Sequence, residues 1–443
     1  MLTWIRRHQH ATAIGILLIG GLLTRFWLFG YPNQTVFDEV YFGKFVSAYF
    51  TGNYYFDIHP PLIKLLIAGY AKLFGYIPTA SFSAIGSAFT DNNYLILRFL
   101  PSLAGALLPL IIYSLSRELG LKTRTALVVG ILVILENALL TQSRFILIDS
   151  LLLAAGFGSL WSYFVWRRSR RWPFIVLAGV LAGIAIGTKW IALPFLFLPL
   201  AYEAIQLASP VRILKIFGAY LGIALTLYLA GFALHATLLT KSGDGDAFMS
   251  REYQSSLEGN QYTSELSLTK PTLPQKIVEI NREMYAANQR LTAGHPYGSK
   301  WYGWPLMIKP ISYWVDGNKQ IWLFGNPIIW LSSTFAVITA TLALITRVIK
   351  PRNRRAVAFL LVGFFVCWLP FALISRVMFL YHYLTPLILA IMILGFLIDT
   401  WRVRWQVTLL MVCAVSFLMV APSSYGVEPD ALTQIWRSIP LWR

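Results

Sequence analysis

The stretch ATAIGILLIGGLLTRFWLF, residues 11–29, is an apolar run in which Arg25 is the single charged residue. A helix needs about 20 such residues to cross the hydrocarbon core of a bilayer. The residues before the run are basic, and no small-residue cleavage site ends it. We therefore expect a retained first membrane span rather than a removed signal peptide.

Similar runs recur along the whole chain and explain its composition. The 443 residues are 57% hydrophobic and 13% charged, whereas a soluble domain keeps roughly a quarter of its residues charged. The formal net charge of +18 would suggest nucleic-acid binding in a soluble protein. Here most basic residues lie in short loops between apolar runs, which indicates membrane topology, so no nucleic-acid partner is expected.

The apolar runs predict an all-α integral membrane protein with about eleven transmembrane helices. We place them near 11–29, 98–116, 124–141, 146–166, 173–188, 190–208, 213–235, 323–346, 356–374, 377–398 and 403–421. Lys and Arg gather in alternate loops, which puts the N-terminus inside and the C-terminus outside by the positive-inside rule.

Two outer segments, residues 30–97 and 236–322, are too long to be turns. The first contains the apolar run Pro61 to Tyr76, which is too short to span and predicts an interfacial helix. In the second, helical spacing from Pro274 to Leu291 predicts another amphipathic helix. The chain thus divides into an N-terminal membrane half with the first outer loop, a second outer loop, and a C-terminal membrane region with an outer tail. These parts are residues 1–235, 236–322 and 323–443.

Some basic residues break the charge pattern because they lie at the outer ends of predicted spans. They are Arg25, Arg98, Arg144, Lys189 and Arg376. Each alone could be a side chain that reaches up to the interface, but charges held at membrane depth tend to mark function. Together they could form an electropositive site for an anion at the outer leaflet, such as the phosphate or pyrophosphate of a lipid.

A carboxylate pair, Asp38-Glu39, follows the first span. Transfer of a glycosyl group to a hydroxyl needs a base for the proton of the acceptor and a cationic site for the departing phosphate. An acid beside several cations meets both needs. Adjacent residues of an extended loop point apart, so we expect Asp38 and Glu39 to have different tasks.

Several stretches resemble protein O-mannosyltransferases and follow one another in the order of that family. They are FDEVYFG (37–43), YFDIHPPL (55–62), LRFLPS (97–102), TQSRFILIDS (141–150), TKW (188–190), HPYGSKW (295–301), WPL (304–306), GNP (325–327) and RVMFLYHY (376–383). The resemblance implies a GT-C glycosyltransferase fold. It also implies inverting transfer of mannose from a polyprenyl phosphate, which is dolichyl phosphate in eukaryotes, to Ser or Thr of secreted proteins.

The resemblance also assigns roles to single residues. Asp38 would be the general base, with Glu39 supporting the site. The donor phosphate would be held by Arg25, Arg98, Gln142 and Lys189. Support of the site is implied for His59, Arg144, Asp149, Arg376 and His382, with a structural ion pair as an equal alternative for Arg144 and Asp149. Contact with the acceptor or the sugar is implied for His295, Trp301 and Trp304, although the two tryptophans could equally anchor the chain at the interface.

His59 invites a metal interpretation, but the two prolines after it are more simply a rigid turn. We therefore predict no metal site, and a divalent cation is the one cofactor left open. The partners implied are the polyprenyl-phosphate-mannose donor, secreted protein acceptors met at the translocon, and membrane lipid.

The second outer loop is too short for the β-trefoil insert of the eukaryotic enzymes. A bacterial member is therefore expected, in the plasma membrane as a multi-pass protein with its site on the outer face. Two other classes stay open. A related GT-C transferase would move another sugar to a lipid or glycan. A transporter would place its charges near the bilayer midplane and often show inverted repeats, neither of which is visible here.

Overall fold

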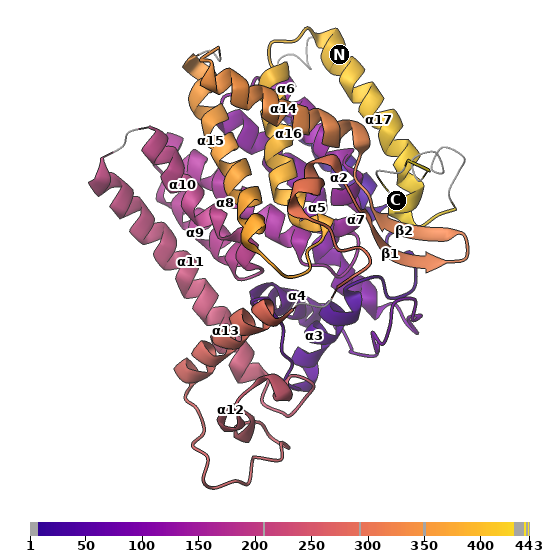
Figure 1. The fold of residues 1–443 in the computed structure, drawn as a ribbon, viewed down its shortest axis with the longest axis vertical. Coiled ribbons are helices and arrows are strands. Elements are labelled where there is room, and N and C mark those ends of the chain that lie inside the picture. Colours follow the sequence, from indigo (N-terminus) through magenta and orange to yellow (C-terminus); the bar gives the residue numbers. More distant parts are fainter. Residues whose placement is uncertain are drawn as a thin grey trace.

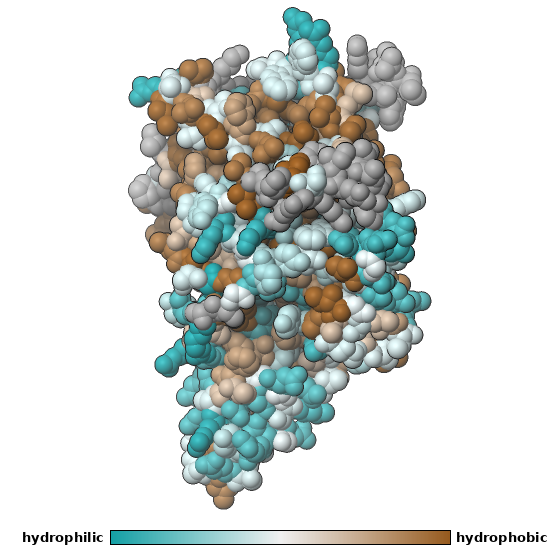
Figure 2. All heavy atoms as spheres, turned by 45° about the vertical axis from the view of Figure 1, so that its right-hand side comes forward, coloured by the Kyte–Doolittle hydropathy of each residue, from teal (hydrophilic) through white to brown (hydrophobic). Residues whose placement is uncertain are grey.

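The computed structural model describes residues 8–206, 209–291, 294–348, 351–428, 438–439 and 442. A bundle of long helices forms one end of the molecule, and a smaller layer built around α3, α4, α12 and α13 forms the other end (Figure 1). Hydrophobic side chains cover much of the bundle surface, while the tapering opposite end is largely hydrophilic (Figure 2). This division is what a membrane domain carrying a water-exposed layer requires.

Each predicted span coincides with a helix or with a pair of helices. The helices are α2 (Gln9–Phe26), α5 (Asn93–Glu118), α6 (Thr123–Ile134) with α7 (Asn137–Ser143), α8 (Asp149–Ser169), α9 (Trp172–Ile186), α10 (Pro194–Ile205), α11 (Pro210–Leu238), α14 (Pro327–Ile345), α15 (Pro351–Trp368), α16 (Leu384–Ile398) and α17 (Val403–Tyr425). Within the described residues, 6 helices are long and apolar enough to cross a membrane, or up to 7 if α6 and α7 form one span. The all-α membrane class is confirmed, while eleven crossings and their orientation stay predictions.

The third predicted span is broken, because α6 and α7 meet at an angle of 60°. Glu136 caps α7 by accepting a hydrogen bond from the backbone of Leu139 at 2.8 Å, and it accepts a second from the backbone of Asn326 at 2.8 Å. Asn326 in turn caps α14, with Pro327 at the first helical position. A Cβ on Gly325 would lie 2.7 Å from the Glu136 carboxylate. The Gly-Asn-Pro stretch, residues 325–327, therefore connects the start of α14 to the start of α7 through the buried carboxylate of Glu136.

The outer layer contains both amphipathic helices that the sequence predicts. They are α4 (Leu62–Leu73) and α13 (Leu273–Arg290). Helix α13 begins with a capping box between Thr272 and Gln275 and buries Ile280 and Met284. These two side chains pack in a cluster with Tyr54 and other residues of the outer loops, beside α11.

Two parts of the outer layer differ from the sequence prediction. The Asp38-Glu39 pair does not lie in an extended loop, because helix α3 (Glu39–Thr51) begins at the second acid. Strands β1 (Ile311–Asp316) and β2 (Lys319–Leu323) form an antiparallel hairpin that was not predicted. The hairpin is irregular near Ser312, which breaks the alternation that would reveal a strand. The two-residue loop of this hairpin, Gly317-Asn318, is a sequence signal of a β-hairpin turn.

Candidate active site

The backbone at Phe37 fixes the start of α3 and so the position of Asp38. Phe37 has a φ of 47°, a left-handed conformation that bulky residues rarely adopt. Its ring stacks on Tyr313 of β1 with centroids 3.9 Å apart, and its backbone N–H donates to the Tyr313 carbonyl at 3.1 Å. These contacts hold the strained residue, as is common next to functional groups. The hairpin therefore positions the first acid.

Glu39 is fully buried, and both of its carboxylate oxygens accept hydrogen bonds. Its carboxylate accepts two hydrogen bonds of 2.7 Å from the Arg98 guanidinium, and one each from the backbone N–H groups of Val36 and Ile146. Arg98 uses its remaining N–H groups on the carbonyls of Gly30, Pro32 and Gln34. All five N–H donors of this guanidinium are thus occupied inside the protein.

Asp38 lies next to Glu39 but in a different environment. It is half-buried and makes no capping hydrogen bond to its own helix. Burial raises the pKa of Asp38 to about 7; the positive charge of Lys189 opposes this rise, while Asp149 and Asp57 add to it. A carboxyl group that titrates near neutrality can accept a proton in a reaction at physiological pH.

A chain of polar contacts connects Lys189 to the hairpin. The Lys189 ammonium lies 2.8 Å and 2.9 Å from the two carboxylate oxygens of Asp149. Asp149 also accepts a 2.8 Å hydrogen bond from the Gln142 amide, whose oxygen accepts one from the Tyr313 hydroxyl. The ammonium further lies 5.1 Å from the centroid of the Tyr381 ring. Gln142 and Lys189 are thus brought together, and Asp149 holds the cation in place.

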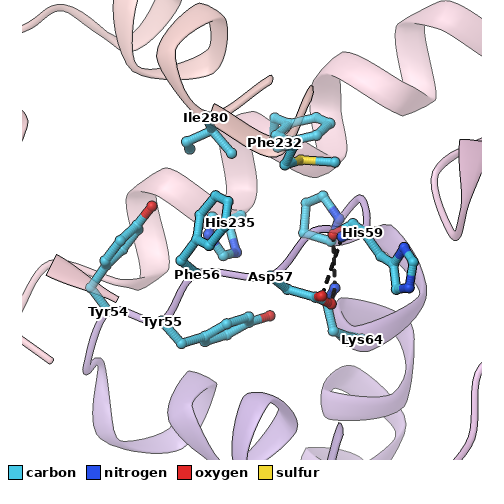
Figure 3. A pocket seen from close by; sticks show the side chains of 11 residues that line it. Tyr54, Tyr55, Phe56, Asp57, His59, Lys64, Phe232, His235 and Ile280 are labelled. Carbon is cyan, nitrogen blue, oxygen red and sulfur yellow. Dashed lines mark hydrogen bonds and ion pairs between the residues drawn. The ribbon is translucent and has the colours of Figure 1, made fainter. Parts of the chain in front are cut away.

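A second buried ion pair joins Asp57 and Lys64 beside the His-Pro-Pro turn. Lys64 also donates to the carbonyls of His59 and Pro60, at 3.0 Å and 3.1 Å. Figure 3 shows these residues around a small pocket with His235, and the His59 ring turned away from the ion pair. The rigid turn expected at this position is present, and a lysine locks it.

Three of the five outer arginines and lysines serve the scaffold. Arg25 donates to the carbonyls of Val133 and Ile134, at the C-terminal end of α6, at 3.0 Å each. Arg144 donates to three carbonyls just beyond α2, those of Trp27, Leu28 and Tyr31. Arg98 belongs to the Glu39 network. Cations are favourable at the C-terminal ends of helices, which explains the first two arginines.

Three of the five cations therefore have protein partners in the structure, and one site formed by all five stays a prediction. Phosphate binding by Arg98 conflicts with its full set of internal partners. The alternative ion pair between Arg144 and Asp149 is wrong, because Arg144 binds carbonyls and Asp149 binds Lys189. Of the five outer cations, Lys189 and Arg376 remain: the charge of Lys189 acts on Asp38, and Arg376 lines a groove.

A groove of about 450 Å³ is lined by Arg376 and by Trp190, the residue after Lys189. Its walls are mostly apolar and come from α10, α13, α15 and the segment after α15. Burial lowers the pKa of Arg376, which stays a half-buried cation at the edge. An apolar groove of this size with a few charged groups at one end is typical of a ligand site.

The aromatic residues of the second outer loop lie in several environments. Trp304 is fully buried, donates to the Ser299 hydroxyl at 2.9 Å and stacks on His382. It is therefore neither an interfacial anchor nor an open platform. Trp301 is half-buried against Trp368. His295 is exposed, with its ring 5.1 Å from that of Phe379, so it is available to a ligand.

Sequence reasoning missed several residues that surround Asp38. The charge of Asp57 adds to the raised pKa of Asp38, burial and the charge of Asp38 raise the pKa of Tyr313, and Lys64 locks the turn. A lysine inside the apolar run of α4 was a usable signal, since a fully buried lysine needs a partner. Tyr313 had no such signal, because the hairpin that carries it was not predicted.

Metal binding was left open by the sequence. Among the described residues, no group of three or more His, Cys, Asp or Glu side chains is arranged to hold a metal ion. The divalent cation therefore has no assigned set of ligands in this protein.

Comparison with known proteins gives matches along most of the chain. Residues 15–240 match the family model described as dolichyl-phosphate-mannose-protein mannosyltransferase. Residues 273–439 match the model of the C-terminal four-span region of protein O-mannosyltransferases. Dolichyl-phosphate-mannose–protein mannosyltransferase 4 of Candida albicans is 34% identical over 273 residues, which are 56% of this chain and 36% of that protein. Protein O-mannosyltransferase 1 of Drosophila pseudoobscura is 36% identical over 267 residues, 55% of this chain and 29% of that protein.

Solved structures show the same fold. The Saccharomyces cerevisiae Pmt1-Pmt2 complex bound to the sugar donor superposes with a TM-score of 0.90 at 21% identity, over 98% of this chain and 93% of that chain. The oligosaccharyltransferase of Archaeoglobus fulgidus superposes with a TM-score of 0.57 at 12% identity, over 99% of this chain and 59% of that one. The GT-C fold expected from the sequence is therefore confirmed.

Proposed function

The chain belongs to the dolichyl-phosphate-mannose-protein mannosyltransferase family, and from this premise we propose that it transfers mannose from a polyprenyl phosphate to Ser or Thr hydroxyls of proteins. The matched segments span about a third of the length of the curated relatives named above. The activity, the donor and the acceptor are therefore proposals for this chain. They are supported by the raised pKa of Asp38, which the charge of Lys189 opposes, and by an apolar groove that Arg376 lines.

In the proposed reaction, Asp38 is the general base. Its carboxylate takes the proton of the acceptor hydroxyl while the hydroxyl oxygen attacks C1 of the mannose. The bond between C1 and the phosphate oxygen breaks, and its electron pair leaves with the lipid phosphate. A single displacement inverts the configuration at C1. Since phosphate is a good leaving group, no second acid is needed to protonate it, and Glu39 is free to hold Arg98.

The donor would be held by the groove and by the two cations at its end. Its polyprenyl chain would occupy the apolar walls, and its phosphate would meet Lys189 and Arg376. Preorganised positive charge stabilises a leaving phosphate most when the charge is fixed before the reaction. Asp149 supplies that fixation for Lys189 through two hydrogen bonds. Arg25, Arg98 and Arg144 would act indirectly, by holding the helices and the loop around the site.

Location and organisation are also proposed. The enzyme would lie in a bacterial plasma membrane with its site on the outer face, where secreted proteins pass. The shortness of the loop at residues 236–322 supports a bacterial source, although the relatives named above are fungal and animal proteins. The three parts at 1–235, 236–322 and 323–443 would be a membrane half with the catalytic loop, a second outer loop and a C-terminal membrane region.

The single observation that carries the proposal is the environment of Asp38, and its replacement tests it. We expect Asp38→Asn to lower mannose transfer from polyprenyl-phosphate mannose to a Ser/Thr peptide by about 10²- to 10⁴-fold. Asp244→Asn, an exposed acid of the second outer loop, is the control and should transfer normally. Full activity of Asp38→Asn would remove Asp38 as the base.

The alternative function is transfer of another sugar to a lipid or glycan, and the GT-C fold is compatible with it. The same assay separates the two. Several polyprenyl-linked sugars are offered to the unmodified protein together with peptide, lipid and glycan acceptors. Transfer to a lipid or glycan without transfer to the peptide would favour the alternative.

A further inference from the structure

The backbone of the His59 turn is locked independently of the His59 ring. The Lys64 ammonium donates to the Asp57 carboxylate and to the carbonyls of His59 and Pro60, which uses all three of its N–H groups. The backbone N–H of His59 donates to the other Asp57 oxygen at 3.2 Å. The two contacts that involve residue 59 use its backbone N–H and its carbonyl. The turn therefore does not need an imidazole for its shape.

Contacts on both sides place this turn between Lys189 and the groove. After the turn, the backbone N–H of Leu62 donates to the carbonyl of Gly187 at 3.0 Å, two residues before Lys189. Before the turn, the Asn288 amide donates to the carbonyl of Ile58 at 3.2 Å. Asn288 itself lines the groove together with Arg376. The turn that carries His59 thus lies between the Gly187 carbonyl and Asn288 of the groove.

The His59 ring is left without a partner in the part of the chain that the structure describes. The hydrogen bonds of this residue involve its backbone, and its side chain is half-buried. Figure 3 shows the ring turned away from the Asp57–Lys64 pair. Burial lowers its pKa well below the usual value, and the positive charges of Lys189, Lys64 and Arg376, with His382, act in the same direction. The ring is a neutral imidazole with one N–H donor to offer.

We propose that the imidazole of His59 binds the phosphate group of the lipid donor, donating a hydrogen bond to a phosphate oxygen between Lys189 and Arg376. The proposal rests on the proposed function, because it assumes a phosphate-bearing lipid in the groove. An anion there would accept a hydrogen bond from the imidazole and lie beside both cations. His59 would then be a binding residue, and Asp57 and Lys64 would position it.

Binding of a short lipid phosphate tests this directly. Tritium-labelled farnesyl phosphate and tritium-labelled farnesol are bound to the purified protein in detergent, so that the two ligands differ in the phosphate alone. We expect His59→Phe to weaken farnesyl phosphate binding by about tenfold or more and to leave farnesol binding unchanged. His59→Gln keeps an N–H donor and should lose less. His10→Phe, at the exposed start of α2, is the matched control and should bind as the unmodified protein does.

The outcomes separate this inference from the proposed function. Unchanged farnesyl phosphate binding by His59→Phe would overturn it, and so would an equal loss of farnesol binding, which would make the ring a structural element. A preference of the unmodified protein for farnesol would overturn it as well. Transfer of mannose is measured separately. Its absence would reject the proposed function, while the two farnesyl ligands would still decide the role of His59.

Discussion

Asp38 and Glu39 are adjacent acids whose surroundings have almost nothing in common. Glu39 is fully buried and accepts four hydrogen bonds, two of them from Arg98. Asp38 has no such partners, and its pKa is raised to about 7. A carboxylate with all its acceptor positions filled holds structure, whereas one poised to bind a proton can do chemistry. The role of a residue in a motif therefore depends less on its type than on whether its polar atoms are already hydrogen-bonded.

The same distinction divides the outer cations. Arg98 has all five N–H donors occupied by protein groups. Arg376 lines the groove as a half-buried cation, and Lys189 is paired with Asp149 but still lowers the pKa of Asp38 through its charge. The proposed chemistry uses Lys189 and Arg376. Replacement of Arg98 tests the structural role, and changes at Lys189 and Asp38 test the reactive role.

The largest effect is expected from removing Arg98. Arg98→Met would leave the buried carboxylate of Glu39 without its cation, which costs about 3–5 kcal/mol of folding free energy. The thermal unfolding temperature of the purified protein in detergent should fall strongly, while Asp38→Asn should unfold at the temperature of the unmodified protein. Arg376→Met is the control for loss of an outer arginine and should keep its unfolding temperature. A stable Arg98→Met that binds farnesyl phosphate poorly would instead restore Arg98 as a donor ligand.

These same residues show how much of the fold and of the site can be predicted from the sequence. Apolar runs located the helices because lipid imposes the pattern along each segment. Helix α4 was predicted from a short apolar run and α13 from helical spacing. The motifs identified Asp38, Gln142 and Lys189, which the structure brings to one region. They could not separate Arg98 from Arg376, because both are basic residues at the outer end of a span. That difference depends on carbonyl groups of a distant loop, at Gly30, Pro32 and Gln34, which the one-dimensional pattern does not contain.

A smaller effect is expected from Lys189, on the reactive side of the comparison. Lys189→Met would remove a hydrogen-bonding charge from the proposed phosphate site, which corresponds to about a 10- to 100-fold loss of kcat/KM for the donor. The loss should appear with phosphate-linked donors and in farnesyl phosphate binding. Because Asp149 would then be buried without its cation, Lys189→Met with Asp149→Asn is measured in parallel. If the double variant regains normal donor affinity, Lys189 serves only to neutralise Asp149.

The smallest effect is a pH dependence that belongs to Asp38. The base must be ionised to accept a proton, and its pKa is raised to about 7. Activity should therefore be full above this pH and fall as the pH drops through it, with kcat/KM about tenfold lower at pH 6 than at pH 8. His59 should stay neutral across this range, because its pKa lies well below its usual value. In Lys189→Met with Asp149→Asn, one opposing and one reinforcing charge are lost together, so the midpoint should move less than in Lys189→Met alone, where it should rise. A pH profile of kcat/KM that is flat between 6 and 8 in the unmodified protein would place the proton acceptor on another group.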